Sequence, residues 1–240
     1  MTDRVPHTVH RFDDELDALR ALVRRMGVIA EEQVSDATRA LFGRDAALAN
    51  RVLAREPELD ALERQIEAQV IRLLALRHPM AADLRLAIAG LKISHNLERV
   101  GDYAANAAKR AIVLSGLPMV GSLNGFERLA QMVTDNLRSA VGAFAGDDIA
   151  TADRVWAADA PVDDVYTGIF RELLTHMIED PRNITAATHL LFIAKNLERV
   201  GDHATNIAET VHFAVRGDQL PSDRPKADSS ATTVVEPGDE

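Results

Sequence analysis

NLERVGD, residues Asn96–Asp102, is the stretch that decides the fold, because the same seven residues recur at Asn196–Asp202. Three positions that follow each string are identical as well. They are Ala104, Asn106 and Ala108 in the first copy and Ala204, Asn206 and Ala208 in the second. Identity of this length in equivalent settings indicates an internal duplication, and a duplication fixes the organisation of the whole chain.

Each string follows a proline-led segment of helical character. Pro79 and Pro181 precede runs rich in Leu, Ile and Ala that lead into the two strings. Before each proline, apolar residues at helical spacing indicate another helix, over about 56–77 and 159–179. Because proline breaks the helical hydrogen-bond pattern, each copy is expected to contain two helices separated near its proline.

A third helix precedes this pair in each copy. Apolar residues three and four positions apart predict a helix from about 10 to 41, and its counterpart covers about 124–145. Short turns follow at 43–45 and 146–148, as antiparallel neighbours in a bundle require. The stretch 116–125, which contains Pro118, separates the two copies.

The sequence therefore predicts an all-α fold of two tandem three-helix bundles. The first repeat is expected over 8–117 and the second over 122–216. Residues 218–240 are rich in Pro, Ser and Asp without an apolar period, which predicts a disordered acidic tail. The expected helices cover residues 8–42, 46–77, 80–115, 123–145, 149–179 and 183–216.

Composition excludes several classes of function. The net charge is −10, and no basic stripe is present, which argues against a nucleic-acid binder. The absence of cysteine means that a metal would need oxygen or imidazole ligands. The N-terminal residues lack a signal-peptide pattern and no apolar run approaches the roughly 20 residues of a membrane span. We expect a cytoplasmic protein that meets a membrane only through partners.

Catalytic motifs are also missing from the sequence. It contains no Gly-rich phosphate loop, no nucleophile elbow and no His-Glu-x-x-His string. A duplicated helical architecture spreads its surface over partners and does not enclose a deep cleft. We therefore expect a protein that is not an enzyme.

Paired carboxylates are the chemical feature that the duplication repeats. Glu98 and Asp102 lie four residues apart, and Glu198 and Asp202 repeat them. On a helix they point away from the apolar face that contains Leu97, so they are expected to face outward. Like charges at this spacing destabilise an exposed helix by roughly 0.2–0.5 kcal/mol. Their repetition therefore favours a compensating cation.

A second carboxylate pair begins the preceding helix of each copy, Glu56 with Asp60 and Asp159 with Asp163. If antiparallel neighbours bring each early pair to a later pair, four carboxylates converge in each repeat and form an oxygen-rich metal site. The alternative is a solvated acidic face, and acids in a first turn also suit the helix dipole. For these early pairs both interpretations remain open.

Four polar residues around the strings have two interpretations. Arg99 and Arg199 reach the aspartates three residues on, so an ion pair within the helix is the alternative to a metal. Asn106 and Asn206 either complete a ligand set or form hydrogen bonds across helices.

The repeated glycines and the histidines are expected to have structural roles. Glycine costs roughly 1 kcal/mol in a helix interior, so Gly101 and Gly201 imply a close approach of backbones. The histidines are expected in ordinary packing or at the surface, because none has a histidine at the corresponding position of the other copy. They include His78, His95, His176, His189 and His203.

The repeated pattern NLERVGD-x-A-x-N, each time after a proline-led helix, resembles the PhoU family of phosphate-transport accessory proteins. LLALRHPMAADLR, from Leu73 to Arg85, is similar to that family's inter-helix segment, and the resemblance covers about residues 8–216. It implies a homodimeric negative regulator of phosphate uptake and of the phosphate-starvation response. Such a regulator links the ATPase of the phosphate ABC transporter to a sensor histidine kinase.

The resemblance also implies metal. The family's motif, Glu or Asp followed by three residues and Asp, matches all four carboxylate pairs, and some members hold multinuclear clusters of transition-metal ions, with iron or zinc expected here. One departure is that the family commonly has Asp where this chain has Asn96 and Asn196. One competing hypothesis is a metal-dependent hydrolase or oxidase, which outward-facing carboxylates fit less well than a signalling adaptor. The other is a metal-storage bundle, which would need a far higher metal loading than two clusters offer.

Overall fold

The computed structural model describes residues 6–221, with side chains from residue 12 onward. This part of the chain is helical and contains no strand. The predicted tail lies outside the described residues from position 222 on. The elements are α1 Pro6–Gly43, α2 Ala46–Ala54, α3 Glu56–Arg77, α4 Ala81–Ser115, α5 Asn124–Gly146, α6 Ile149–Ala157, α7 Asp159–Glu179, the 3-10 turn Pro181–Asn183 and α8 Ile184–Arg216.

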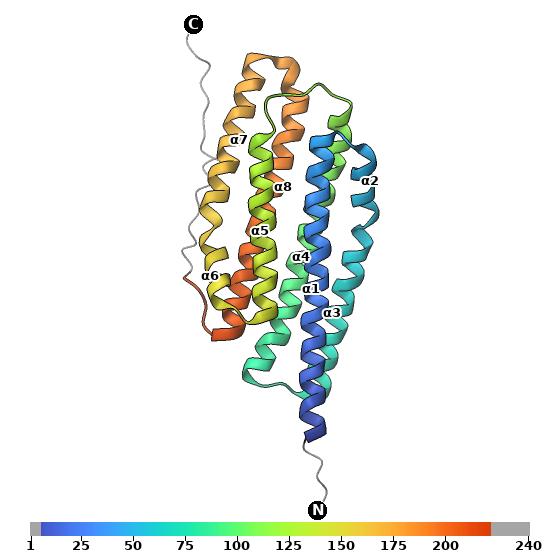
Figure 1. Cartoon of the computed structure of the whole chain (residues 1–240), viewed down its shortest axis with the longest axis vertical. Coiled ribbons are helices and arrows are strands. Elements are labelled where there is room, and N and C mark those ends of the chain that lie inside the picture. Colours follow the sequence, from blue (N-terminus) through green and yellow to red (C-terminus); the bar gives the residue numbers. More distant parts are fainter. Residues whose placement is uncertain (1–5, 222–240) are drawn as a thin grey trace, which may run out of the picture.

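The predicted all-α fold of two three-helix bundles is confirmed. In the first half α1, the α2–α3 segment and α4 run up and down as three columns, and α5, the α6–α7 segment and α8 repeat this arrangement in the second half (Figure 1). Among residues 6–221, none of the helices combines the length and the apolar character that crossing a membrane requires.

Two of the six expected helices, 46–77 and 149–179, are each interrupted, whereas the shorter segments expected at 56–77 and 159–179 match α3 and α7. The breaks fall at Arg55 and Ala158. Pro57 lies at the start of α3, and Pro161 lies two residues into α7. A proline has no N–H to donate to the carbonyl one turn earlier, so it is tolerated in the first turn of a new helix and not in the interior of a longer one.

The predicted turns after α1 and α5 are present and have the same construction. Arg44 and Asp147 both adopt φ 51°, in the left-handed region that ends a helix. The carboxylates of Asp45 and Asp148 then accept hydrogen bonds from backbone N–H groups three residues on, at 2.8 and 3.0 Å. These N-caps start α2 and α6, so the duplication is preserved in its local hydrogen bonds.

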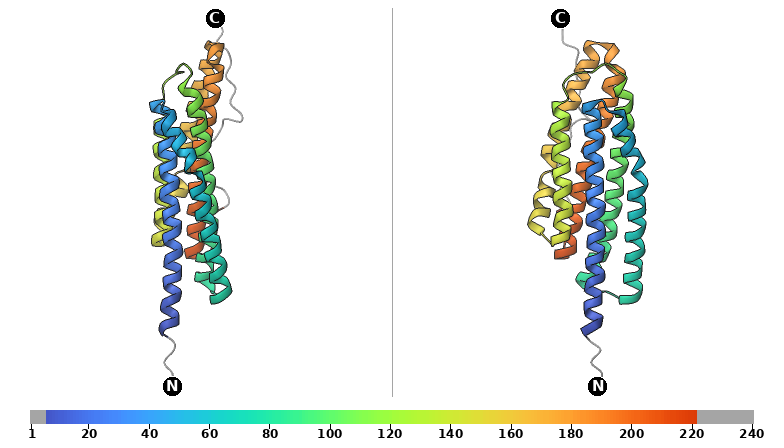
Figure 2. Two further views of the ribbon diagram at one scale, coloured as in Figure 1. Left: turned by 90° about the vertical axis from the view of Figure 1, so that its right-hand side faces the viewer. Right: turned by 45° about the vertical axis from the view of Figure 1, so that its right-hand side comes forward.

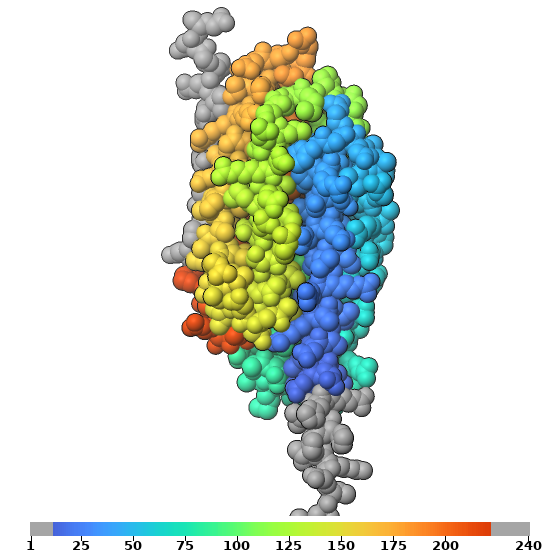
Figure 3. Space-filling model, in the orientation of Figure 1, coloured from blue at the N-terminus to red at the C-terminus, as the bar shows by residue number. Residues whose placement is uncertain are grey.

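The two halves pack side by side through their longest helices. α4 and α8 run antiparallel at the centre, and α1 lies against α5, so that α3 and α7 occupy the two flanks (Figure 2). Figure 3 shows the seam between α1 and α5 on one face of the molecule. Across this seam Arg20 pairs with Asp147 at 2.7 Å, and Arg138 pairs with Glu31.

The repeated glycines mark close approaches between helices, as predicted, but the two are not equally tight. A Cβ placed on Gly101 would overlap Cδ1 of Leu59 on α3. A Cβ placed on Gly201 would lie 3.2 Å from Cγ1 of Val162 on α7. The first glycine is therefore required by packing, whereas the second leaves room for a small shift.

We expect Gly101→Ala to lower the free energy of unfolding by about 1–3 kcal/mol, because the methyl group displaces Leu59 from a packed core. Gly201→Ala is the matched control. It should change the free energy by less than about 1 kcal/mol, because better helix propensity offsets a mild contact. Urea unfolding followed by circular dichroism measures both, and equal losses would contradict the difference in packing.

Candidate functional site

The two repeated strings lie at mid-helix, on α4 and α8, where the two halves meet. Their apolar residues point into the core as predicted. Leu97 and Val100 are fully buried, and Leu197 and Val200 nearly so. This inward face fixes the rotation of each helix and therefore the direction of the polar residues between the apolar ones.

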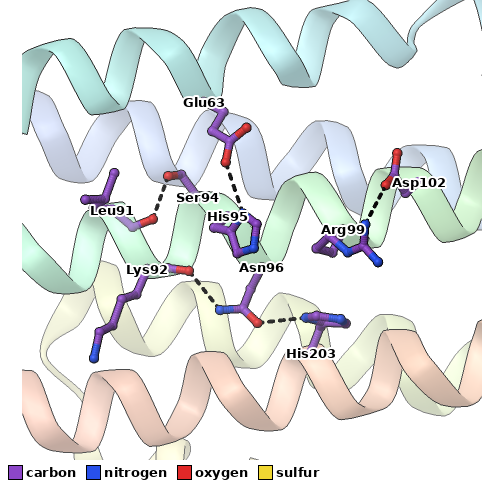
Figure 4. A network of polar contacts seen from close by, with 9 residues as sticks. All are labelled: Glu63, Leu91, Lys92, Ser94, His95, Asn96, Arg99, Asp102 and His203. Carbon is purple, nitrogen blue, oxygen red and sulfur yellow. Dashed lines mark hydrogen bonds and ion pairs between the residues drawn. The ribbon is translucent and has the colours of Figure 1, made fainter.

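A polar contact joins the two strings. Asn96 donates its amide N–H to the carbonyl of Lys92 at 2.8 Å, so its Oδ1 is directed to Nδ1 of His203, 2.7 Å away (Figure 4). His203 in turn lies against Tyr103, with ring centroids 5.5 Å apart. Asn96 is thus part of the contact between halves, and His203 packs there, as the sequence interpretation expected of histidine.

Burial lowers the pKa of His203 to about 4. Asp202 opposes this effect, whereas the nearby cations Arg99 and Arg199 add to it. His203 is therefore neutral near pH 7. A neutral imidazole that faces the Oδ1 of Asn96 donates the Nδ1 proton, which fixes the tautomer.

The arginines of the strings contact the same aromatic ring. The guanidinium of Arg99 lies 5.5 Å and that of Arg199 lies 5.6 Å from the ring centroid of Tyr103. Arg99 also donates to Asp102 at 3.2 Å, which is the ion pair within the helix that the sequence offered as an alternative. The arginines therefore act as packing and pairing groups where α4 meets α8.

In the first half, Glu98 and Asp102 are half-buried on α4. Burial raises the pKa of Glu98, and the negative charges of Asp102 and Glu63 raise it further, against the opposing effect of Arg99. Glu63 on α3 also contacts His95, at 3.3 Å (Figure 4). Three carboxylates are thus electrostatically coupled at this place.

Glu63 was missed by sequence reasoning, although it lies one turn after Asp60 on the same helix. Glu56 and Asp60 are half-buried on α3. Asn106 is exposed and Asn206 is half-buried. The roles of these four predicted residues as ligands stay predictions.

In the second half the outward orientation expected for the string carboxylates is wrong for Glu198. Asp159 and Asp163 are each 3% exposed, and Glu198 is 5% exposed, whereas Asp202 is half-buried. The reason is the neighbouring helix, because α7 covers the polar side of α8. Side chains on these two helices surround the carboxylates, and the sequence pattern on a single helix does not report them.

Two residues that sequence reasoning missed, Lys195 and Thr205, contact this buried set, and a third, Tyr166, lies beside the lysine. Lys195 donates to Oε1 of Glu198 at 2.8 Å, and its ammonium group lies 4.9 Å from the ring centroid of Tyr166. The hydroxyl of Thr205 contacts Oδ1 of Asp159 at 3.4 Å. A comparison of the two copies could have found Lys195 and Thr205, because His95 and Ala105 occupy the corresponding positions in the first copy.

A metal site requires several ligand side chains that converge on one point. Over the described part of the chain, no group of three or more His, Asp or Glu residues is placed so that it could hold a metal ion. As arranged, the carboxylates therefore do not fit a ligand set, and metal binding at the eight predicted residues stays a prediction.

Comparison with known proteins covers both halves of the chain. The family model described as PhoU domain matches it twice, at residues 23–111 and 126–211. The phosphate-specific transport system accessory protein PhoU homolog of Caulobacter vibrioides is 51% identical over 223 residues, which are 92% of this chain and 97% of that protein. The protein of the same description from Rhizobium meliloti is 44% identical over 94% of this chain and 96% of its own length.

Solved structures agree with this result. The crystal structure of PhoU from Pseudomonas aeruginosa superposes with a TM-score of 0.83 at 39% identity, over 86% of this chain and all of that one. The phosphate transport system regulatory protein PhoU from Streptococcus pneumoniae superposes with a TM-score of 0.82 at 26% identity, over 88% of this chain and 99% of that one.

The neutral state of His203 predicts a loss of stability in acid. The folded pKa of about 4 lies below the ordinary 6.5, so the unfolded chain binds the proton first as pH falls. Stability is fully present above about pH 6.5 and declines toward pH 4, by on the order of 1–2 kcal/mol after a discount for partial exposure.

His203→Gln should remove this component of the acid loss. Between about pH 7 and about pH 4.5 the unfolding free energy, measured by urea titration, should therefore fall more in the wild type than in the variant. His95→Gln is the control, because that side chain is 69% exposed. A wild type and a His203→Gln variant with identical pH slopes would contradict the burial of a neutral imidazole.

Proposed function

The chain belongs to the PhoU family, and on that premise we propose that it is a cytoplasmic negative regulator of phosphate uptake and of the phosphate-starvation response. In this role it acts as a homodimer that contacts the ATPase subunit of the phosphate ABC transporter and a phosphate-sensing histidine kinase. The observation that carries the proposal is the match of both halves to the same domain, together with 51% identity to an accessory protein of phosphate transport.

The shape of the molecule supports an adaptor between two partners. The turn between α3 and α4 and the turn between α7 and α8 lie at its two opposite ends (Figure 1). Leu76 and Met80, the latter 80% exposed, flank the turn between α3 and α4, and Ile178 and Ile184 flank the turn between α7 and α8. Apolar side chains at such exposure are typical of surfaces that partners cover.

The surface between the halves supports a binding role more than a catalytic one. A groove runs along the seam of α1 and α5, and charged residues line it. Its cations are engaged in ion pairs, Arg39 with Asp36 at 3.0 Å and Arg138 with Glu31. A catalytic site is expected to hold an acid or base with a shifted pKa in an enclosed pocket, whereas this groove is lined by paired charges. Relatives of this chain are also named as accessory proteins.

The metal part of the proposal concerns the first half. Glu98, Asp102 and Glu63 repel one another, and a transition-metal ion such as iron or zinc would offset that repulsion. Since no three described side chains are placed as ligands, binding requires rotamer changes at these positions. Such changes are accessible because all three side chains are only partly buried.

Deletion of the gene tests the regulatory role. We expect phosphate-starvation genes to stay expressed at high phosphate in the deletion strain, because the restraint on the kinase is lost. A reporter fused to a starvation promoter measures this, and a plasmid copy of the wild-type gene should restore repression. Full repression in the deletion strain would refute the proposal.

Substitutions at the two ends test the adaptor geometry. Met80→Lys and Ile184→Lys each place a charge on one apolar end, so each should lose one partner and retain the other. Pull-down with the transporter ATPase subunit and with the cytoplasmic part of the kinase measures both contacts. Ile71→Lys, at an exposed position of α3 away from the turn, is the control. Wild-type binding of both partners by both variants would rule out these ends as contact surfaces.

Elemental analysis of protein purified after iron or zinc supplementation tests the metal. The expected result is bound metal in the wild type that is lost in Glu98→Gln/Asp102→Asn and kept in Glu67→Gln, an exposed carboxylate of α3. Equal metal content in all three proteins, or none in the wild type, would contradict a first-half site.

A further inference from the structure

The carboxylates of the second half lie in an interior that the chain itself has built. α7 contributes Asp159 and Asp163, and α8 contributes Glu198, all almost completely buried. A carboxylate removed from water needs a nearby cation or several hydrogen-bond donors, because the loss of hydration is large. The question is which group provides this compensation.

The ammonium group of Lys195 is in place to provide it. It lies 2.8 Å from Oε1 of Glu198, one turn away on α8, and over the ring of Tyr166 on α7. The hydroxyl of Thr205, which is also on α8, contacts Asp159 on α7. The Glu198 side chain is 6% exposed, whereas that of Lys195 is 34% exposed, so the carboxylate of the pair is screened from water and the charge interaction is stronger than a fully solvated one.

The first half has no such lysine. The position three residues before Glu98 is His95, an exposed side chain that contacts Glu63 and not Glu98. Where Thr205 stands in the second half, the first half has Ala105. The duplication has therefore kept the carboxylates in both copies but has placed a lysine against the glutamate in only one, since the cation of the first half, Arg99, pairs with Asp102.

We propose that Lys195 is a built-in counter-cation that replaces a metal ion in the second half. The Lys195–Glu198 ion pair then lies where a cation would bind, and a metal that entered would have to displace the lysine from Glu198. The family motif is present in both halves, but at most the first half serves as a metal site. This inference concerns the stability of the purified protein and does not depend on the regulatory function.

The test uses a background in which the string carboxylates of the first half are neutral, Glu98→Gln/Asp102→Asn, so that the proposed first-half site no longer binds an added ion. Melting temperatures are measured with and without zinc or manganese chloride. In this background we expect no shift on addition of either ion. Adding Lys195→Gln should lower the melting temperature by several degrees, and the ion should restore more than half of that loss, because the carboxylates regain a cation.

Two further variants complete the experiment. Lys195→Gln/Glu198→Gln replaces the ion pair by two neutral groups, so it should melt higher than Lys195→Gln and gain little from the ion. This variant keeps the test valid if Lys195→Gln alone fails to fold. Lys109→Gln, which removes an exposed lysine of α4, should behave as the background does.

Three results would overturn the proposal. One is a melting temperature that rises with the ion while Lys195 is intact, which would mean that the lysine does not exclude metal. Another is a Lys195→Gln variant that melts with the background, since the ion pair would then not stabilise the fold. The third is a destabilised Lys195→Gln variant that the ions do not rescue, because the carboxylates would then not accept a metal in place of the lysine.

Discussion

The antiparallel packing of α4 against α8 is the constraint on which the rest of the structure depends. Each three-helix half has to bury one face of its longest helix, and the other half provides the surface that covers it. Leu97 and Leu197 set the rotation of the two helices. That rotation brings Asn96 of the first string into contact with His203, the residue that follows the second string. It also places the arginines of both strings against Tyr103.

Much of the fold could be predicted because the duplication supplies each signal twice. The turns after α1 and α5 and the inward face of the strings follow from local patterns that the structure confirms. The interruptions at Arg55 and Ala158 were predicted only in part, because the segments at 56–77 and 159–179 were recognised but then joined to the short apolar helix before each of them. The burial of Glu198 did not follow, since it depends on how closely α7 covers α8, and helical spacing describes one helix at a time.

Divergence between the copies gives the molecule two different faces on a nearly symmetric scaffold. The first half presents half-buried, mutually repelling carboxylates around Glu98, whereas in the second half Lys195 neutralises Glu198 from within. The two ends likewise differ in their exposed apolar residues. A scaffold of this kind suits the proposed adaptor, because two partners that share one protein need two surfaces that can be told apart.

We infer that duplication preserved the packing of the two halves and divided their chemistry. Anomalous X-ray diffraction from crystals of the wild-type protein grown with zinc, recorded at the zinc absorption edge, tests it most directly. The account predicts a peak beside Glu98 and Asp102 and none beside Glu198. A peak beside Glu198, with Lys195 displaced, would contradict it.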